Sequence, residues 1–229
     1  MTKKPFVSFK FATERSCLSL ERTHPRRPPR DSVLLFANEP VLIYLQELVN
    51  SLHLSGKVTC APIPLQTAAG GGLERSLKVA PCRRLYLVLE WDGDASNTAP
   101  QVWQEFQNSL LRPDSVSPRL ICCRPSFDLW LLLHFEDPSP EADDTAWLKE
   151  RVQHLLATSA PDNGHLSLFA RIAARLDTAQ NRSLRMARER QLAGVSDDWF
   201  SDQPGTNLHE LTAFLNKLAS RIPDHSSSS

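Results

Sequence analysis

Three carboxylates follow an apolar run in the stretch YLVLEWDGDA, at Glu90, Asp92 and Asp94. Side chains alternate along an extended chain, so all three point to the same side if the strand continues through them. Carboxylates held this close repel one another, and their pKa values rise unless a cation neutralises them. Mg²⁺ and Mn²⁺ prefer oxygen ligands and are the expected partners. The alternative is a turn without metal, because Asp-Gly-Asp is common turn chemistry.

A fourth carboxylate, Glu39, precedes Pro40 in SVLLFANEPVLIYLQEL, where an apolar strand runs into an amphipathic helix. The carboxyl ends of neighbouring parallel strands meet at one edge of a sheet, so Glu39 could face the acids at 90 to 94 as a further ligand. The alternative is an acid in the first turn of a helix, where it favours the helix dipole by roughly 0.3–1 kcal/mol.

Short apolar runs alternate with segments of helical periodicity from residue 33 onward. Strands are predicted at 32–36, 58–65, 83–90 and 117–123, with helices at 40–54, 67–80 and 101–111 between them. Nearly continuous apolar strands separated by single helices indicate an α/β fold with a parallel sheet covered on both faces. Two prolines confine the strand at 58–65 to an edge or end it early.

Composition divides the chain into four parts. Residues 1–30 carry eight Lys or Arg against two Glu and end in a Pro- and Arg-rich run, which predicts a flexible basic arm, or else a solvated tail without a partner. Residues 31–137 form the α/β core. Residues 138–222 form a helical region packed on that core, with an Arg-rich helix at 166–192 and a final helix that Asn207 could cap. Residues 223–229 are a disordered tail.

The overall composition excludes several classes. Basic and acidic residues balance at 26 each, so the whole chain is not a general binder of polyanions. The five cysteines show no CxxC spacing, which supports neither a disulfide framework nor a zinc site. No apolar run approaches the roughly 20 residues that cross a bilayer, and no apolar segment follows Lys3 and Lys4 as in a signal peptide. A cytoplasmic protein with no membrane partner is expected.

The segment 124–137, RPSFDLWLLLHFED, places Asp128 and His134 in otherwise apolar surroundings. Six residues apart, they are offset by roughly 240° on a helix, so they do not share one face. A buried ionisable group needs a partner. For His134 a core or boundary histidine is the favoured interpretation.

This segment resembles the Asn-Pro-x-Phe-Glu-Leu-Trp-Leu-Leu-Leu-His-Phe signature of RloB-like proteins, a family of the Toprim-type nuclease-like group. Arg124 stands at the asparagine and Asp128 at the glutamate. VLEWDGD is similar to the family's Asp-x-Asp strand, with Glu90 and Asp92 at its two acids, and QPGTNLHEL is similar to its Asn-Pro-Ser-Thr-x-Val-His-Glu-Leu. The resemblance covers about residues 25–220.

The resemblance implies a Toprim-like fold and a Mg²⁺- or Mn²⁺-dependent nuclease of bacterial phage defence, acting on RNA or DNA beside an AAA or ABC-type ATPase. In such a site Glu39, Glu90 and Asp92 would be catalytic, and Asp94 would join them in holding the metal. The family's first motif, Glu-Gly-Glu-Lys-Thr-Glu, aligns its first glutamate with Ala37 and places Glu39 at the second acid. A shift of two residues would restore Glu39 to the first place.

Several supporting roles follow as expectations. Asp128 and His134 could orient the acids, and Arg124 could contact phosphate. The Arg-rich helix, with Arg182, Arg185 and Arg188, could track a nucleic-acid backbone, or could simply present a solvated face. Two alternatives to the nuclease stay open. One is a non-catalytic member of the same fold that binds nucleic acid or an ATPase, and the other is an interaction domain whose acids are turn residues.

Overall fold

The computed structural model describes residues 32–64, 82–92, 99–109, 118–159, 166–194 and 204–221. The predicted basic arm at 1–30, the glycine turn and helix at 67–80, Asp94 and the tail at 223–229 lie outside the described residues.

A five-stranded sheet in the order β2-β1-β3-β4-β5 forms the centre of the molecule. Its parallel strands are β1 (Val33–Ala37), β2 (Val58–Pro62), β3 (Arg84–Glu90) and β4 (Pro118–Arg124). The short β5 (Gly205–Thr206) pairs with β4 in the antiparallel sense. The predicted α/β class is confirmed, and β2 lies at an edge as its prolines indicated. The sheet is mixed because of β5, which is too short to show a periodicity of its own.

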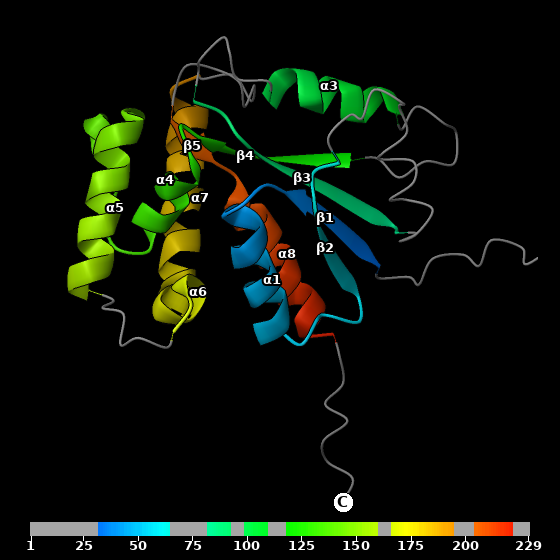
Figure 1. Cartoon of the computed structure of the whole chain (residues 1–229). Helices are drawn as coiled ribbons and strands as arrows, with labels where there is room; N and C mark the ends of the chain where they lie inside the picture. Colours follow the sequence, from blue (N-terminus) through cyan, green and yellow to red (C-terminus); the bar gives the residue numbers. More distant parts are fainter. Residues whose placement is uncertain are drawn as a thin grey trace, which may run out of the picture.

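Helices cover both faces of the sheet and extend past one edge (Figure 1). They are α1 (Val41–Ser51), α3 (Ala99–Ser109), α4 (Phe127–Leu133), α5 (Thr145–Ser159), α6 (Leu168–Ile172), α7 (Leu176–Leu192) and α8 (Leu208–Ala219). Two 3-10 turns, η1 (Pro140–Asp143) and η2 (Ala173–Arg175), join some of them. The helix predicted at 166–192 is therefore divided into α6, η2 and α7. None of the helices in the described ranges is long and apolar enough to cross a membrane.

Alternate residues of the strands feed two hydrophobic cores. On one face Leu34, Phe36 and Leu87 pack against α3. On the other, Leu35 and Val88 pack in a larger core with residues of α1, α4, α5, α7 and α8. The segment after residue 138 thus shares the core of the sheet and also supplies its fifth strand.

The side chain of Asn207 joins the last helix to the sheet by two hydrogen bonds to β4. It stands at the N-cap position of α8, but its side chain makes no capping hydrogen bond. Instead its Oδ1 accepts the Cys122 N–H at 2.8 Å and its Nδ2 donates to the Leu120 carbonyl at 3.1 Å. Asn207 therefore occupies the predicted cap position, but its side chain bonds to β4 and not to the first turn of α8. An amide carries a donor and an acceptor, so Asn207 continues the ladder of β4 as a further strand residue would.

Replacing Asn207 with alanine is expected to lower the free energy of unfolding by about 2–3 kcal/mol, because two hydrogen bonds are lost and the buried Cys122 N–H is left unpaired. Urea unfolding monitored by circular dichroism measures the change. Lys217→Ala, at an exposed position of the same helix, should change stability by less than about 0.5 kcal/mol. Equal stability of the two variants would contradict the role given to Asn207.

Candidate active site at the carboxyl edge of the sheet

Three neighbouring strands end at one edge of the sheet, and the predicted acids follow them. Strands β1 and β3 run in register with Phe36 opposite Leu87, and β3 and β4 run in register with Glu90 opposite Cys123. The chain passes from β1 outward to β2 and then returns to β3 on the other side of β1. Ligands of open α/β sheets bind at such a reversal, outside the carboxyl ends of the strands.

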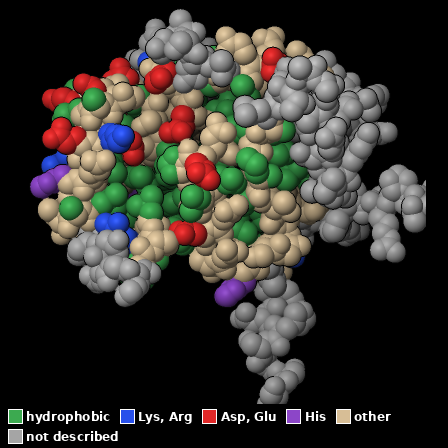
Figure 2. Space-filling view, in the orientation of Figure 1, with side chains coloured by type: hydrophobic (Ala, Val, Ile, Leu, Met, Phe, Trp, Pro, Cys, Tyr) green, Lys and Arg blue, Asp and Glu red, His purple; other side chains and the backbone are tan. Residues whose placement is uncertain are grey.

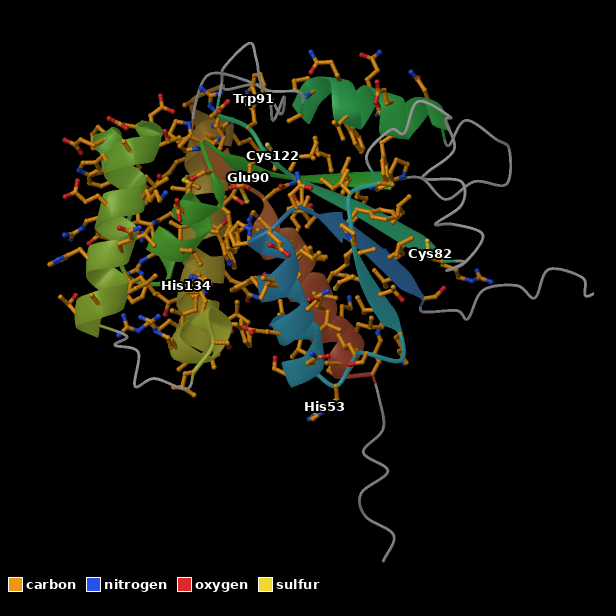
Figure 3. The ribbon with its side chains drawn as sticks, viewed as in Figure 1. His53, Cys82, Glu90, Trp91, Cys122 and His134 are labelled. Atoms are coloured by element: carbon orange, nitrogen blue, oxygen red, sulfur yellow. The ribbon has the colours of Figure 1, made fainter. Side chains whose placement is uncertain are left out.

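Glu90, the last residue of β3, is held by the start of α4. Its Oε1 accepts the Phe127 N–H at 2.7 Å, and Figure 3 shows it among the strand ends. Burial raises the pKa of Glu90, and the nearby carboxylates of Asp128 and Asp92 raise it further, against the opposing effect of the Phe127 N–H. Glu90 is therefore a partly buried carboxyl group for which a neighbouring positive charge would be favourable.

Asp128 lies beside Glu90 because α4 begins directly after β4. Ser126 caps the helix, its Oγ accepting the Asp128 N–H at 3.3 Å, and all residues of α4 except Asp128 are buried. Burial raises the pKa of Asp128, while Lys149 of α5 lowers it. The structure thus brings together the predicted site residue Glu90 and the predicted supporting residue Asp128.

The turn after β1 does not bring a buried carboxylate to the candidate site. Ala37 ends β1 with its side chain in the core, and Glu39 is exposed in the turn before α1. Asp92 is also exposed, two residues beyond the end of β3. In the described ranges no three His, Cys, Asp or Glu side chains are grouped so as to hold a metal ion. Of the four predicted acids, Glu90 and Asp92 follow β3 at this edge, Glu39 is exposed in its turn, and Asp94 lies outside the described residues. Asp128 of α4 is a further acid near Glu90.

His134 is buried apart from these acids, at the carboxyl end of α4 (Figure 3). Its Nδ1 is 2.9 Å from the Trp130 carbonyl oxygen, and its ring meets those of Tyr44 and Trp130 edge to face. Only 2 % of the residue is exposed, and this burial lowers its pKa to about 4. The structure thus favours the interpretation of His134 as a core residue over its interpretation as a residue that orients the acids.

The neutral His134 makes stability depend on pH. An unfolded histidine titrates near 6.5, so below that pH the unfolded state binds a proton that the folded state accepts only near pH 4. Stability is therefore complete above about pH 6.5 and is lost as the pH falls, by roughly 3 kcal/mol at pH 4. His134→Gln should flatten this part of the profile in urea unfolding. Parallel profiles of the two proteins between pH 7 and pH 4 would contradict the assignment.

The arginines of α7 are largely engaged with an acid of the same chain. Arg182 and Arg185 both pair with Asp137, and Arg182 also donates to the Leu133 carbonyl at 2.9 Å. They line an open pocket of about 360 Å³, whose other lining residues are Asp137, Pro138, Met186 and Glu189. Arg188 is exposed. Acids balance the charges of the paired arginines. The structure therefore favours a solvated helix face over a basic surface that tracks a nucleic-acid backbone.

A serine and a histidine that the sequence did not single out lie in contact, but as part of the fold. Ser183 of α7 is fully buried, and its hydroxyl donates to the Thr206 carbonyl at 2.9 Å. Its Oγ is also 2.7 Å from the His209 Nδ1. With the hydroxyl proton donated to the Thr206 carbonyl, an Nδ1–H of His209 completes the contact with the Ser183 oxygen. The pair fastens α7 to β5 and α8.

One of the comparisons with known proteins agrees with the motifs of the carboxyl edge. A family model described as RloB-like protein matches residues 48–215. None of the curated proteins matches the chain, and none of the solved structures does. The match includes β3, β4, α4 and the Asn207 segment and begins after Ala37 and Glu39. It spans well over half of the 229 residues. The chain therefore belongs to the RloB-like protein family.

Proposed function

We propose that this RloB-like protein is a Mg²⁺- or Mn²⁺-dependent nuclease that hydrolyses phosphodiester bonds of RNA or DNA in bacterial defence against phages. The observation that carries the proposal is the position of Glu90. It ends a central strand at the reversal point of the sheet, is fixed by the Phe127 N–H, and lies near the carboxylates of Asp128 and Asp92.

The donor set fits a hard divalent cation. Mg²⁺ is usually held by one or two carboxylates, with water and substrate phosphate completing its coordination, so a site does not require three acids from the protein. Glu90 and Asp92 would hold the ion, with Asp94 and Glu39 as further oxygen donors, and Asp128 would support Glu90 from α4. A bound ion would neutralise the repelling carboxylates and stabilise negative charge on the phosphate.

Glu90 is also suited to proton transfer. One of its oxygens is occupied by the Phe127 N–H, which fixes the orientation of the carboxyl group. Its raised pKa brings it closer to neutral pH, where a general acid or base is most effective. Glu39 would approach from the neighbouring strand end, in the Toprim-like arrangement that the family resemblance suggests.

Electrostatics constrain how a nucleic acid could approach. Figure 2 shows acidic side chains gathered on the side of the molecule where α5 lies, with few basic ones among them. Such a surface repels phosphate unless cations are bound, so we assign the attraction to the divalent ion and the basic segment 1–30. Arg188 could add to it, whereas Arg182 and Arg185 are already paired with Asp137. An AAA or ABC-type ATPase partner is part of the proposal.

A second candidate function is a non-catalytic, Toprim-like subunit that binds nucleic acid or regulates such an ATPase. It is favoured by Ala37, which is buried at the end of β1 where the family's first glutamate aligns. If the protein is non-catalytic, the acids at the carboxyl edge of the sheet are left from an ancestral metal site and bind a divalent ion only weakly.

The two candidates differ in a direct experiment. Full-length protein is incubated with labelled single-stranded RNA and DNA in Mn²⁺, Mg²⁺ or EDTA, and Mn²⁺ binding is measured by calorimetry. The nuclease should cut only with metal, and an Asp92→Asn, Asp94→Asn double variant should lose both binding and cleavage. Undiminished cleavage by the double variant, or a complete lack of Mn²⁺ binding by the natural protein, would exclude the nuclease.

A further inference from the structure

Arg124 occupies a fixed place at the same edge of the sheet, one strand away from Glu90. It is the last residue of β4 and pairs with Gly205 of β5, while its neighbour Cys123 lies opposite Glu90. Arg124 and Glu90 therefore lie at the ends of neighbouring strands, at the same edge of the sheet.

Two nitrogens of the Arg124 guanidinium are buried without a hydrogen-bond partner among the described residues. Only 6 % of the residue is exposed, and the two atoms are Nε and Nη1. The acid paired with it is Asp143 of η1, whose Oδ1 is 4.0 Å from Nη2 and so beyond hydrogen-bonding distance. Arginine stays charged in proteins. An uncompensated buried charge is strongly destabilising, so this group requires an anion.

Two arginines that are more exposed than Arg124 make much closer contacts with acids. Arg151 donates two hydrogen bonds to Glu136, at 2.7 and 2.5 Å, although its side chain is 38 % exposed. Arg182 pairs with Asp137 at 3.3 Å and donates to a carbonyl at 2.9 Å. Arg124 is the more buried residue and has the weaker contact, which is the reverse of what desolvation demands of a purely structural ion pair.

We propose that Arg124 is the receptor for an oxyanion of the phosphate class. The planar fork of N–H donors on a guanidinium matches the oxygens of a phosphate, and the carboxyl edge of an α/β sheet is where phosphates are bound. The bound oxyanion takes the unpaired Nε and Nη1 donors. Asp143, whose side chain is 50 % exposed, moves away from the guanidinium into solvent.

The source of the phosphate rests on the proposed function. In a nuclease with Glu90 and Asp92 at the reacting bond, Arg124 at the end of β4 holds another phosphate of the same nucleic-acid strand. Arg124 is then a positioning residue, because it fixes which phosphodiester bond of the nucleic acid lies at the acids. The oxyanion site itself depends only on the contacts of Arg124.

The test is binding without metal, so that it is separate from cleavage. Full-length protein in EDTA is titrated by calorimetry with inorganic phosphate and with short single-stranded RNA and DNA. Arg124→Gln should weaken the binding of both kinds of probe at least tenfold. Asp143→Asn, which removes the competing acid and keeps the guanidinium, should tighten phosphate binding several-fold. Arg119→Gln, at an exposed position of the same strand, is the matched control and should leave phosphate affinity unchanged.

Each result decides for or against the site. Phosphate binding by Arg124→Gln at the natural affinity would overturn it, as would an equal loss in Arg119→Gln. If Arg124→Gln does not fold, Arg124→Lys and Asp143→Asn decide: Lys keeps the charge without the planar fork, so phosphate binding should still weaken. Loss of stability in Asp143→Asn without a gain in phosphate affinity would make the two residues a structural pair and overturn the proposal.

The two probes also test where the phosphate comes from. Binding of inorganic phosphate but not of oligonucleotides would contradict a nucleic acid as the source of the bound phosphate. Phosphate binding that persists where no cleavage occurs would leave the site standing and exclude only the nuclease.

Discussion

Replacing Glu90 with glutamine is expected to reduce the proposed metal-dependent cleavage by about 100-fold to 10,000-fold while the protein stays folded. The amide oxygen of glutamine can still accept the Phe127 N–H, so the link between β3 and α4 is kept. The charge that would hold a cation and the group that would transfer a proton are both lost. Removing a partly buried carboxylate that lies near Asp128 and Asp92 also relieves repulsion, so metal-free Glu90→Gln should be at least as stable as the natural protein.

Cleavage rates of labelled RNA and DNA in Mg²⁺, and urea unfolding in EDTA, measure the two effects separately. Glu105→Gln, an exposed acid on α3, is the matched control for a surface charge and should keep full activity. Activity of Glu90→Gln within threefold of the control would contradict the assignment. Lower stability of Glu90→Gln in EDTA would contradict the account of its surroundings.

Replacing Trp130 with alanine is expected to have the largest effect on stability, a loss of about 3–5 kcal/mol in the free energy of unfolding. Trp130 is fully buried in α4, its Nε1 donates to the Tyr44 hydroxyl at 3.0 Å, and its ring meets that of His134 edge to face. Alanine would leave a cavity between α1 and α4 and an unpaired hydroxyl. Since α4 also carries Phe127 and Asp128, the same change should lower activity by displacing the start of the helix.

Tyr44→Phe separates packing from hydrogen bonding. It keeps the aromatic contacts of Tyr44 with Phe127 and Phe169 but removes the acceptor of the Trp130 N–H, so a loss of about 1–3 kcal/mol is expected. Urea unfolding at pH 7 compares the variants. If Trp130→Ala lowers the free energy of unfolding by less than about 1 kcal/mol, the packing of Trp130 does not make the large contribution to stability assigned to it.

The strands of the sheet could be predicted because each is a short apolar run. Val33–Ala37 is buried throughout, and such a run indicates a strand covered on both faces. The prolines of β2 placed it at an edge. The role of Asn207 could not be predicted. Its local sequence is that of a helix cap, but the distant β4 offers better partners in the Cys122 N–H and the Leu120 carbonyl.

The acids of the candidate site were visible in the sequence, but their grouping was not. Glu90 and Asp92 could be placed at a strand end from alternation alone. Asp128 stands 38 positions after Glu90 and approaches it only because α4 begins at the end of the neighbouring strand. The same packing leaves Glu39 exposed and encloses His134 between aromatic rings.

The sequence by itself determined the α/β class, the family and the identity of the carboxylates, because these depend on local periodicity and on motifs that are contiguous in the chain. The tertiary structure alone decided which charges meet. It set Asp128 beside Glu90, paired two arginines with Asp137, and buried two nitrogens of Arg124 without an acceptor among the described residues. The physical reason is that burial and pairing depend on groups brought together by strand order and helix packing, and no spacing along the chain encodes these directly.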